Sequence, residues 1–262
     1  MSQRTRLRSR PVAWIGGAVL VALIAGGGFG FWYLFLRPSG PAPVSISNVP
    51  LATAPGVAPT TAAGSAPVTA SGSSAANRSL DGTWKVDQSV GSFSDFSGSF
   101  VGYRVQEQLA SLGAKTAVGR TPDVTGSITL QGTTVSAGTF TADLTTLESD
   151  DDRRDGQLRR QGIQTSQFPS ATFTLTQPIA LGALPADGAS IQATATGDFT
   201  LHGVTKSVQL PLQARRSGNV IAVTGSLPIV FADYGIEKPS SFVVLSIDDH
   251  GTMEFQLLFT KG

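Results

Sequence analysis

Cysteine is absent from the 262 residues, and histidine occurs only twice, as His202 and His250. A zinc site needs three or four converging ligands, so two histidines without any thiol give little support for one. The acidic run from Asp150 is no EF-hand loop either, because its twelfth position is Gln161 and not glutamate. No G-x-S-x-G elbow presents a serine nucleophile. We therefore expect no enzyme activity, no cofactor and no metal, with both histidines in turns.

Acidic residues are absent before residue 80, and this divides the chain into two parts. All 18 Asp and Glu follow that point, whereas six of the 19 Lys and Arg precede it, so the later part has a formal charge of about −5. Nucleic-acid binding calls for a basic surface. The charge distribution therefore indicates that nucleic acid is not a partner.

Charged residues are also missing from Val12 to Leu36, a run of 25 residues. As a helix it would extend about 37 Å at about 1.5 Å per residue, more than the roughly 30 Å hydrocarbon core of a bilayer. Four arginines precede the run, which by the positive-inside rule keeps the N-terminus in the cytoplasm. We predict a cytoplasmic tail (1–11), a transmembrane helix (12–36) and an extracytoplasmic remainder, so a single-pass protein of the cell membrane. A cleaved signal peptide is the alternative, but it would end in small residues, where bulky Trp32 to Leu36 stand here.

Aromatic residues are missing from residues 38–79, which consist mainly of Pro, Ala, Gly, Ser, Thr and Val with one charge, at Arg78. Such a composition cannot bury enough apolar surface to offset the entropy of ordering. We predict a disordered linker at 37–79 and a folded domain at 80–262. A domain of that size can be stable on its hydrophobic core without disulfides.

Beyond residue 80 apolar and polar residues alternate with period two, which is typical of strands that bury one face. Phe173 and Leu175, for example, share one face, and the intervening threonines share the other. Similar runs are 127–130, 197–201, 208–213, 220–227, 242–247 and 253–259. About eight such strands with little helix predict an all-β antiparallel fold. Closure into a barrel would remove exposed edges, and a two-sheet sandwich is the nearest alternative.

One segment breaks the alternation and predicts a short helix over 151–160. Ser149 or Asp150 can cap its start, and Gly162 lies just beyond its end. Acids early, arginines late and the Asp155–Arg159 pair all suit a helix. Because Leu158 is its one clear core contact, we expect the helix on a rim of the barrel.

Three motifs in order resemble the YceI-like family: Arg154 to Leu158 followed by Phe168 to Phe173, then Gly197 to Lys206, then Asp233 to Ile236. The resemblance extends over roughly Gly82 to Thr260. It implies a secreted or periplasmic, lipocalin-like antiparallel barrel whose interior accommodates a polyisoprenoid or another long apolar lipid. Family members usually carry histidines in their first strands, where this chain has Asp87 to Phe93 and Ser99 to Arg104. We therefore expect the mouth of the barrel near these strands, and with it the ligand, to differ from those of other family members.

The ligand would contact the aromatic and aliphatic residues expected on the inner faces of the strands. These are Phe100, Tyr103, Phe140, Phe173, Leu175, Phe199, Leu201, Leu210, Phe231, Tyr234, Phe255 and Leu257. A solid core would use the same residues, and an eight-stranded barrel can be filled by side chains or hold one small ligand. The sequence thus leaves two functions open: a membrane-anchored lipid-binding protein, or a solid cell-surface module that docks protein partners.

Overall fold

A computed structural model of the protein describes residues 40–51, 80–110, 113–238 and 244–262. The predicted cytoplasmic tail and the predicted transmembrane helix at 12–36 lie outside these residues. Within them, no helix is both long and apolar enough to span a bilayer.

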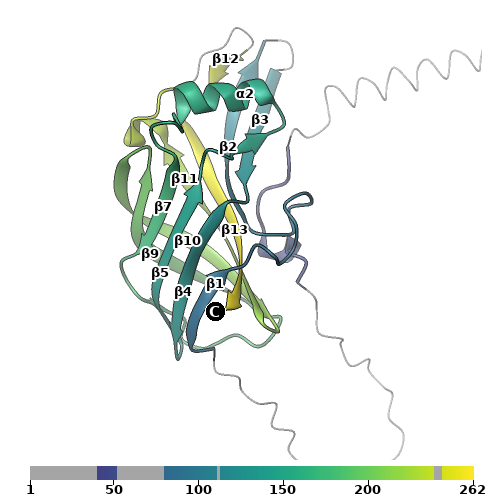
Figure 1. Ribbon diagram of the computed structural model, residues 1–262, viewed down its shortest axis with the longest axis vertical. Coiled ribbons are helices and arrows are strands. Elements are labelled where there is room, and N and C mark those ends of the chain that lie inside the picture. Colours follow the sequence, from purple (N-terminus) through teal and green to yellow (C-terminus); the bar gives the residue numbers. More distant parts are fainter. Residues whose placement is uncertain (1–39, 52–79, 111–112, 239–243) are drawn as a thin grey trace, which may run out of the picture. The chain divides into compact units, whose positions relative to one another are not determined.

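Eight antiparallel strands close a barrel (Figure 1). In order around the ring they are β1 (Gly82–Val86), β4 (Val124–Gln131), β5 (Thr134–Asp143), β7 (Ser170–Leu175), β9 (Ser190–Leu201), β10 (Val204–Ser217), β11 (Val220–Val230) and β13 (His250–Lys261). The ring closes where β1 pairs with β13, with Trp84 opposite Lys261. The predicted antiparallel barrel is therefore confirmed, and the sandwich alternative is excluded.

Four further strands extend the sheet at one end of the barrel. They are β2 (Phe100–Leu109), β3 (Gly113–Thr121), β6 (Glu148–Ser149) and β12 (Val244–Ile247), and the short β8 (Ile179–Ala180) pairs with β5 near the other end. Strand β13 pairs with β1 through residues 259–261 but with β2 through residues 252–256. Since β2 then pairs with β3 and not with β4, strand pairing among the described residues leaves this end of the ring open.

The turn between β9 and β10 explains how a histidine fits a tight hairpin. His202 and Gly203 both have positive φ, 52° and 74°, as a two-residue hairpin turn requires. The His202 Nδ1 lies 3.0 Å from the carbonyl oxygen of Tyr234, in the 3-10 helix η4 (Phe231–Tyr234), and its ring packs on Phe168. The predicted role of His202 in a turn is confirmed.

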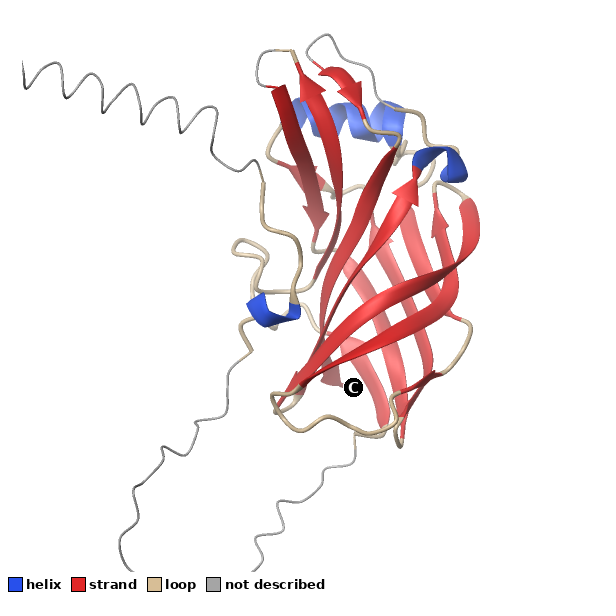
Figure 2. Ribbon diagram, turned by 180° about the vertical axis from the view of Figure 1, so that it is seen from behind, coloured by secondary structure: helices blue, strands red, loops and turns tan. Residues whose placement is uncertain are grey.

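A helix lies across the open end of the barrel, as predicted, but its bounds differ (Figure 2). Helix α2 (Asp152–Gln157) continues into a π-helical turn, η3 (Leu158–Gly162). The cap is Asp151, not Ser149 or Asp150, because the Asp151 carboxylate accepts hydrogen bonds from the backbone N–H of Arg153 and Arg154. Ser149 instead donates to Asp155, over 2.6 Å.

The predicted Asp155–Arg159 side-chain pair does not form. Arg159 Nε donates to the backbone carbonyl of Asp155, since the Asp155 carboxylate already accepts two hydrogen bonds from Ser149.

Residues 40–51, here called the strap, depart from the predicted disordered linker. The strap contains a 3-10 helix, η2 (Ile46–Asn48), and belongs to the same compact unit as the barrel. Its Ile46 and Val49 are buried against Ala222 and Leu258 on the outer face of β11 and β13. Two apolar residues at the spacing of one helical turn thus help to dock a segment whose overall composition is typical of a linker. The rest of the predicted linker, apart from residues 40–51, lies outside the described residues.

Candidate functional site

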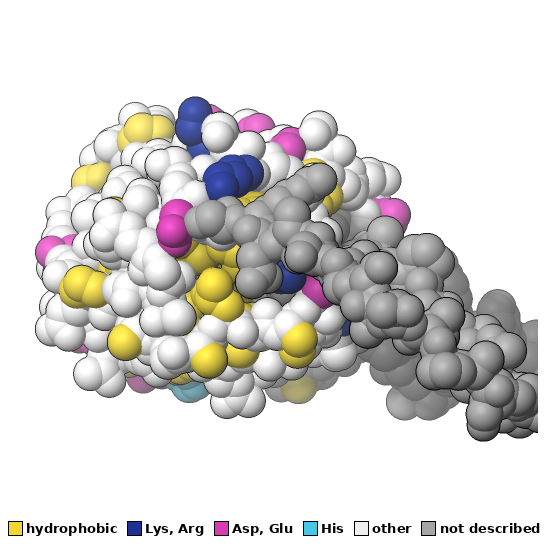
Figure 3. All heavy atoms as spheres, turned by 90° about the horizontal axis from the view of Figure 1, so that it is seen from below, with side chains coloured by type: hydrophobic (Ala, Val, Ile, Leu, Met, Phe, Trp, Pro, Cys, Tyr) yellow, Lys and Arg dark blue, Asp and Glu magenta, His cyan; other side chains and the backbone are white. Residues whose placement is uncertain are grey.

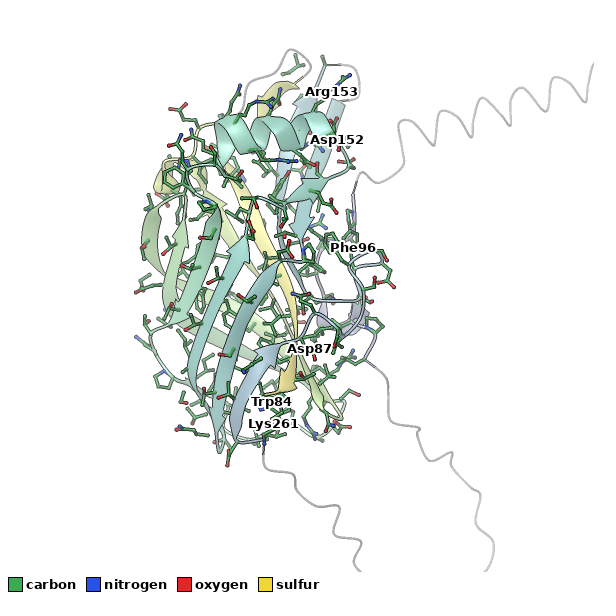
Figure 4. All side chains as sticks on the ribbon, viewed as in Figure 1. Trp84, Asp87, Phe96, Asp152, Arg153 and Lys261 are labelled. Atoms are coloured by element: carbon green, nitrogen blue, oxygen red, sulfur yellow. The ribbon has the colours of Figure 1, made fainter. Side chains whose placement is uncertain are left out.

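The barrel encloses a cavity of about 720 Å³ that runs along its length. Most of its wall consists of inward-facing aliphatic and aromatic side chains. At one end it reaches Glu107, Lys115 and α2, and at the other Leu80, Leu184 and Arg216. In Figure 4 the labelled residues Asp152 and Arg153 mark the first end, and Trp84 and Lys261 mark the second. Figure 3 views the second end and shows hydrophobic side chains gathered in the middle of that face.

The cavity exists because several aromatic rings lie flat against the barrel wall. A Cβ built on Gly225 would come within 2.6 Å of the Phe255 ring, and one on Gly197 within 2.5 Å of the Phe173 ring. Gly126 faces Phe140, and Gly119 faces Tyr103, in the same way. The glycines thus leave room for rings that would otherwise project across the barrel and fill it.

The structure brings ten of the twelve sequence-predicted residues to the cavity wall. These are Tyr103, Phe140, Phe173, Leu175, Phe199, Leu201, Leu210, Phe231, Phe255 and Leu257. Phe100 is not part of the wall, because it lies on the outer face of β2, where its ring packs against Phe96 and the Arg120 guanidinium. Tyr234 is buried in η4, with its ring edge-to-face against Phe199, and does not line the cavity either.

Tyr103 is the one predicted residue of β2 and β3 that lines the cavity, and the other wall residues of these two strands were not predicted. Val101, Val105 and Glu107 line the cavity together with Tyr103, since alternate residues of β2 share its inner face. The alternation through 101–107 was a usable signal, but Glu107 interrupts its hydrophobic character. A buried carboxylate among inward-facing residues is intelligible only once its partner, on a helix far along the chain, is known.

The partner of Glu107 is Arg154 of α2. The two residues belong to a network of charged side chains at the α2 end of the cavity. Arg154 donates to Glu107 and to Asp150, over 2.6 Å in each case, and Lys115 donates to Asp150 over 2.9 Å. Burial opposes ionisation of Asp150, but the hydrogen bonds from Lys115 and Arg154 outweigh it and hold its pKa below the ordinary value. The network fixes α2 over the mouth through paired charges.

Metal-binding clusters of three or more His, Asp or Glu do not occur in the part of the chain that the structure describes. Neither histidine lines the cavity. His250 is exposed beside Asp249, and the hydrogen bond between them raises the pKa of His250. The cavity wall therefore offers apolar contact along its length and polar groups at its ends, which suits binding of an elongated apolar molecule.

The YceI-like domain matches residues 84–259 of this chain, which confirms the resemblance carried by the motifs. The fold is similar to that of a polyisoprenoid binding domain from Saccharophagus degradans, with a TM-score of 0.52, 18% identity and coverage of 70% of this chain and 99% of that chain. BcnA of Burkholderia cenocepacia is similar at a TM-score of 0.49 and 18% identity, covering 66% of this chain and 98% of that one. No curated protein sequence matches significantly.

Proposed function

Because this chain belongs to the YceI-like family, we propose that its barrel binds a polyisoprenoid or another long apolar lipid. The observation that carries the proposal is the elongated, mostly apolar cavity of about 720 Å³. Ligand cavities commonly measure about 300–1,000 Å³ and are lined by hydrophobic side chains with a few polar groups. The likeness in fold to a polyisoprenoid binding domain supports this choice of ligand class.

Close packing favours a cavity that is occupied by a ligand. Protein interiors are packed about as densely as organic crystals, and an apolar void loses the dispersion contacts of every side chain that lines it. A lipid chain in the cavity restores these contacts and removes its own surface from water, at roughly 25 cal/mol per Å². The glycine–aromatic pairs keep the interior open, so a solid scaffold, the alternative considered from sequence, does not suit this barrel.

We also propose where the protein is located in the cell. The uncharged run at 12–36 behind four arginines supports a protein anchored in the cell membrane, with its N-terminus cytoplasmic and its barrel outside. An extracytoplasmic barrel beside a bilayer could exchange lipid with the outer leaflet. The proposed role is binding without chemistry, and no cofactor is needed for it.

The test is lipid analysis of the full-length chain, purified in a detergent distinguishable by mass. Native mass spectrometry and solvent extraction should find a long-chain lipid in the wild-type protein. Ala195→Phe adds a ring to the cavity wall and should abolish loading. Thr194→Phe adds the same ring on the exposed outer face of β9 and should not. A wild-type barrel without lipid, or equal loading of Ala195→Phe, contradicts the proposal.

A further inference from the structure

Tyr103 carries a hydroxyl group that the fold leaves without a partner. The hydroxyl is buried and makes no hydrogen bond within the described residues, although Tyr103 lines the cavity. Buried polar groups are nearly always hydrogen-bonded, and a buried donor without a partner costs about 1–3 kcal/mol. The ring lines the cavity, but the hydroxyl itself is covered, so a ligand group reaches it only after a small movement of the ring. An unpaired donor beside the cavity therefore points to a group that arrives with the ligand and draws the hydroxyl toward it.

The position of the Tyr103 ring is fixed by its neighbours. Tyr103 lies directly opposite Gly119 in the β2–β3 pairing, and a Cβ on that glycine would stand 2.3 Å from the ring. The ring consequently lies against β3. The charged groups that act on the hydroxyl are Arg154, Asp155, Glu107 and Asp150, which all belong to the α2 end.

The charges at this end do not favour an anion. Arg154 is already paired with Glu107 and Asp150, and Lys115 is paired with Asp150. The cavity wall and the charged network at this end contain more carboxylates than cations. The carboxylates are Glu107, Asp150, Asp151 and Asp155, and the cations are Lys115, Arg154 and Arg153, the last exposed at the rim. Lys115 and Arg154 are thus already paired, and a phosphate or carboxylate brought here would find only the exposed Arg153 without a carboxylate partner among the described residues.

The hydroxyl itself stays protonated. Burial raises the pKa of Tyr103 above its ordinary value, and the nearby carboxylates raise it further against the opposing charge of Arg154. At neutral pH the group is therefore an uncharged donor, and it pairs best with an oxygen acceptor.

We propose that Tyr103 donates a hydrogen bond to an uncharged oxygen at the polar end of the bound lipid, such as that of an alcohol, ether or carbonyl group. The polar end then lies beneath α2, and the apolar chain extends along the barrel toward the turn between β10 and β11. This inference rests on the proposed lipid-binding function and adds to it the chemistry of the head group and the direction of the chain.

The opposite end of the cavity supplies the competing arrangement. Arg216 lies there on the inner face of β10 and contacts Asp187 at 3.4 Å, and it donates to the carbonyl oxygen of Gly218 at 3.1 Å. A lipid with an anionic end could bind in the reverse direction, with that end at Arg216. The Nε of Arg216 is also buried without a hydrogen-bond partner, but the charge of Arg216 is already paired with Asp187. The Tyr103 hydroxyl has no partner of any kind within the described residues, so we favour the first arrangement.

The experiment uses the delipidated full-length chain and three probes with one skeleton: geranylgeraniol, geranylgeranyl diphosphate and the corresponding hydrocarbon. Affinities are measured by displacement of a fluorescent apolar probe. Tyr103→Phe should weaken geranylgeraniol binding about fivefold, the value of one net hydrogen bond, and should leave hydrocarbon binding unchanged. Comparing variants for the same probe cancels the solvation of the probe. Wild-type protein should bind the alcohol more tightly than the diphosphate.

Two controls separate the possible failures. Tyr103→Phe should be as stable as the wild type or more so without lipid, because it removes the unpaired hydroxyl, and Arg216→Met should not change geranylgeraniol binding. If the probes bind but Tyr103→Phe has no effect, or the diphosphate binds most tightly and depends on Arg216, this inference is wrong while lipid binding stands. If none of the three probes binds, the proposed function is wrong as well.

Discussion

At the scale of single residues, glycine and aromatic residues decide whether this barrel is hollow. Gly225 lies directly opposite Phe255, and Gly126 directly opposite Phe140, in the strand pairings. Each ring occupies the space that a side chain on the facing residue would need. The aromatic residues thus contribute apolar surface to the wall without occupying the lumen.

Replacing Gly225 by alanine should push the Phe255 ring off the wall. The added Cβ would come within 2.6 Å of the ring, so either the ring or the strand must move. We expect a loss of about 1–3 kcal/mol in the free energy of unfolding, measured by chemical denaturation, together with reduced lipid loading. Gly138→Ala is the matched control, because its nearest neighbours lie at an ordinary 3.6 Å. Equal effects of the two substitutions would contradict this account.

Asp87 should make stability depend on pH at the end of β1. Its carboxylate accepts hydrogen bonds from Ser89 and, across to β13, from Thr260, and these lower its pKa below the ordinary 3.8. A carboxyl group whose pKa is lower in the folded state stabilises the fold above the unfolded-state value and loses that effect as pH falls through the folded-state pKa.

The variant Asp87→Ala should therefore be about 1 kcal/mol less stable than the wild type at about pH 6. The difference should shrink as pH falls below 3.8, when the wild-type carboxylate becomes protonated. Denaturant titrations of both proteins at about pH 6 and at a pH below 3.8 measure this difference in stability. A constant difference would show that Asp87 acts through packing and not through its charge.

At the scale of elements, the strap is held by arginines as well as by apolar contacts. Glu254, nearly inaccessible at 1% exposure, pairs with Arg104 and Arg120 at 2.7 Å. These two arginines also donate to the backbone carbonyls of Pro41 and Ala42. The buried carboxylate thus positions two guanidinium groups that bind the strap backbone whatever its side chains are.

Removing the apolar contacts should release the strap from the barrel. Ile46→Ala and Val49→Ala together delete its two buried side chains, and we expect a loss of about 2–4 kcal/mol in unfolding free energy. Faster amide exchange and proteolysis within residues 40–51 would report release while the barrel remains folded. Ser47→Ala with Asn48→Ala, both exposed, is the control pair. Unchanged proteolysis in the first variant would show that the arginine contacts alone hold the strap.

At the scale of the whole molecule, an apolar interior of about 720 Å³ couples stability to ligand. A ligand that binds only the folded state stabilises it by an amount set by its concentration relative to Kd, about 2.7 kcal/mol at a hundredfold excess. Delipidation should therefore lower the melting temperature, and adding lipid back should restore it. Calorimetry on the wild type and on Ala195→Phe gives the measurement, because the variant, whose added ring obstructs the cavity, should not respond. An equal response of both proteins would place the lipid outside the cavity.

Local patterns were sufficient for strands β4, β7 and β9 to β13, for the hairpin at His202 and for the presence of the rim helix, but no predicted run covered β1, β2, β3 or β5. Period-two alternation and turn residues act over a few positions and need no tertiary information. The helix cap was misplaced by one or two residues, because Ser149 was already committed to Asp155. The strap was missed because its docking depends on Ala222 and Leu258, more than 170 residues away.

The sequence by itself determined an all-β antiparallel domain, its family through three motifs, and most of the residues that face inward, since side-chain direction follows from strand periodicity. Tertiary structure alone decided that the barrel is hollow, because that depends on which glycine faces which ring across neighbouring strands. It also placed Phe100 outside and left the Tyr103 hydroxyl without a partner. These facts depend on the packing of distant segments, which no local pattern encodes.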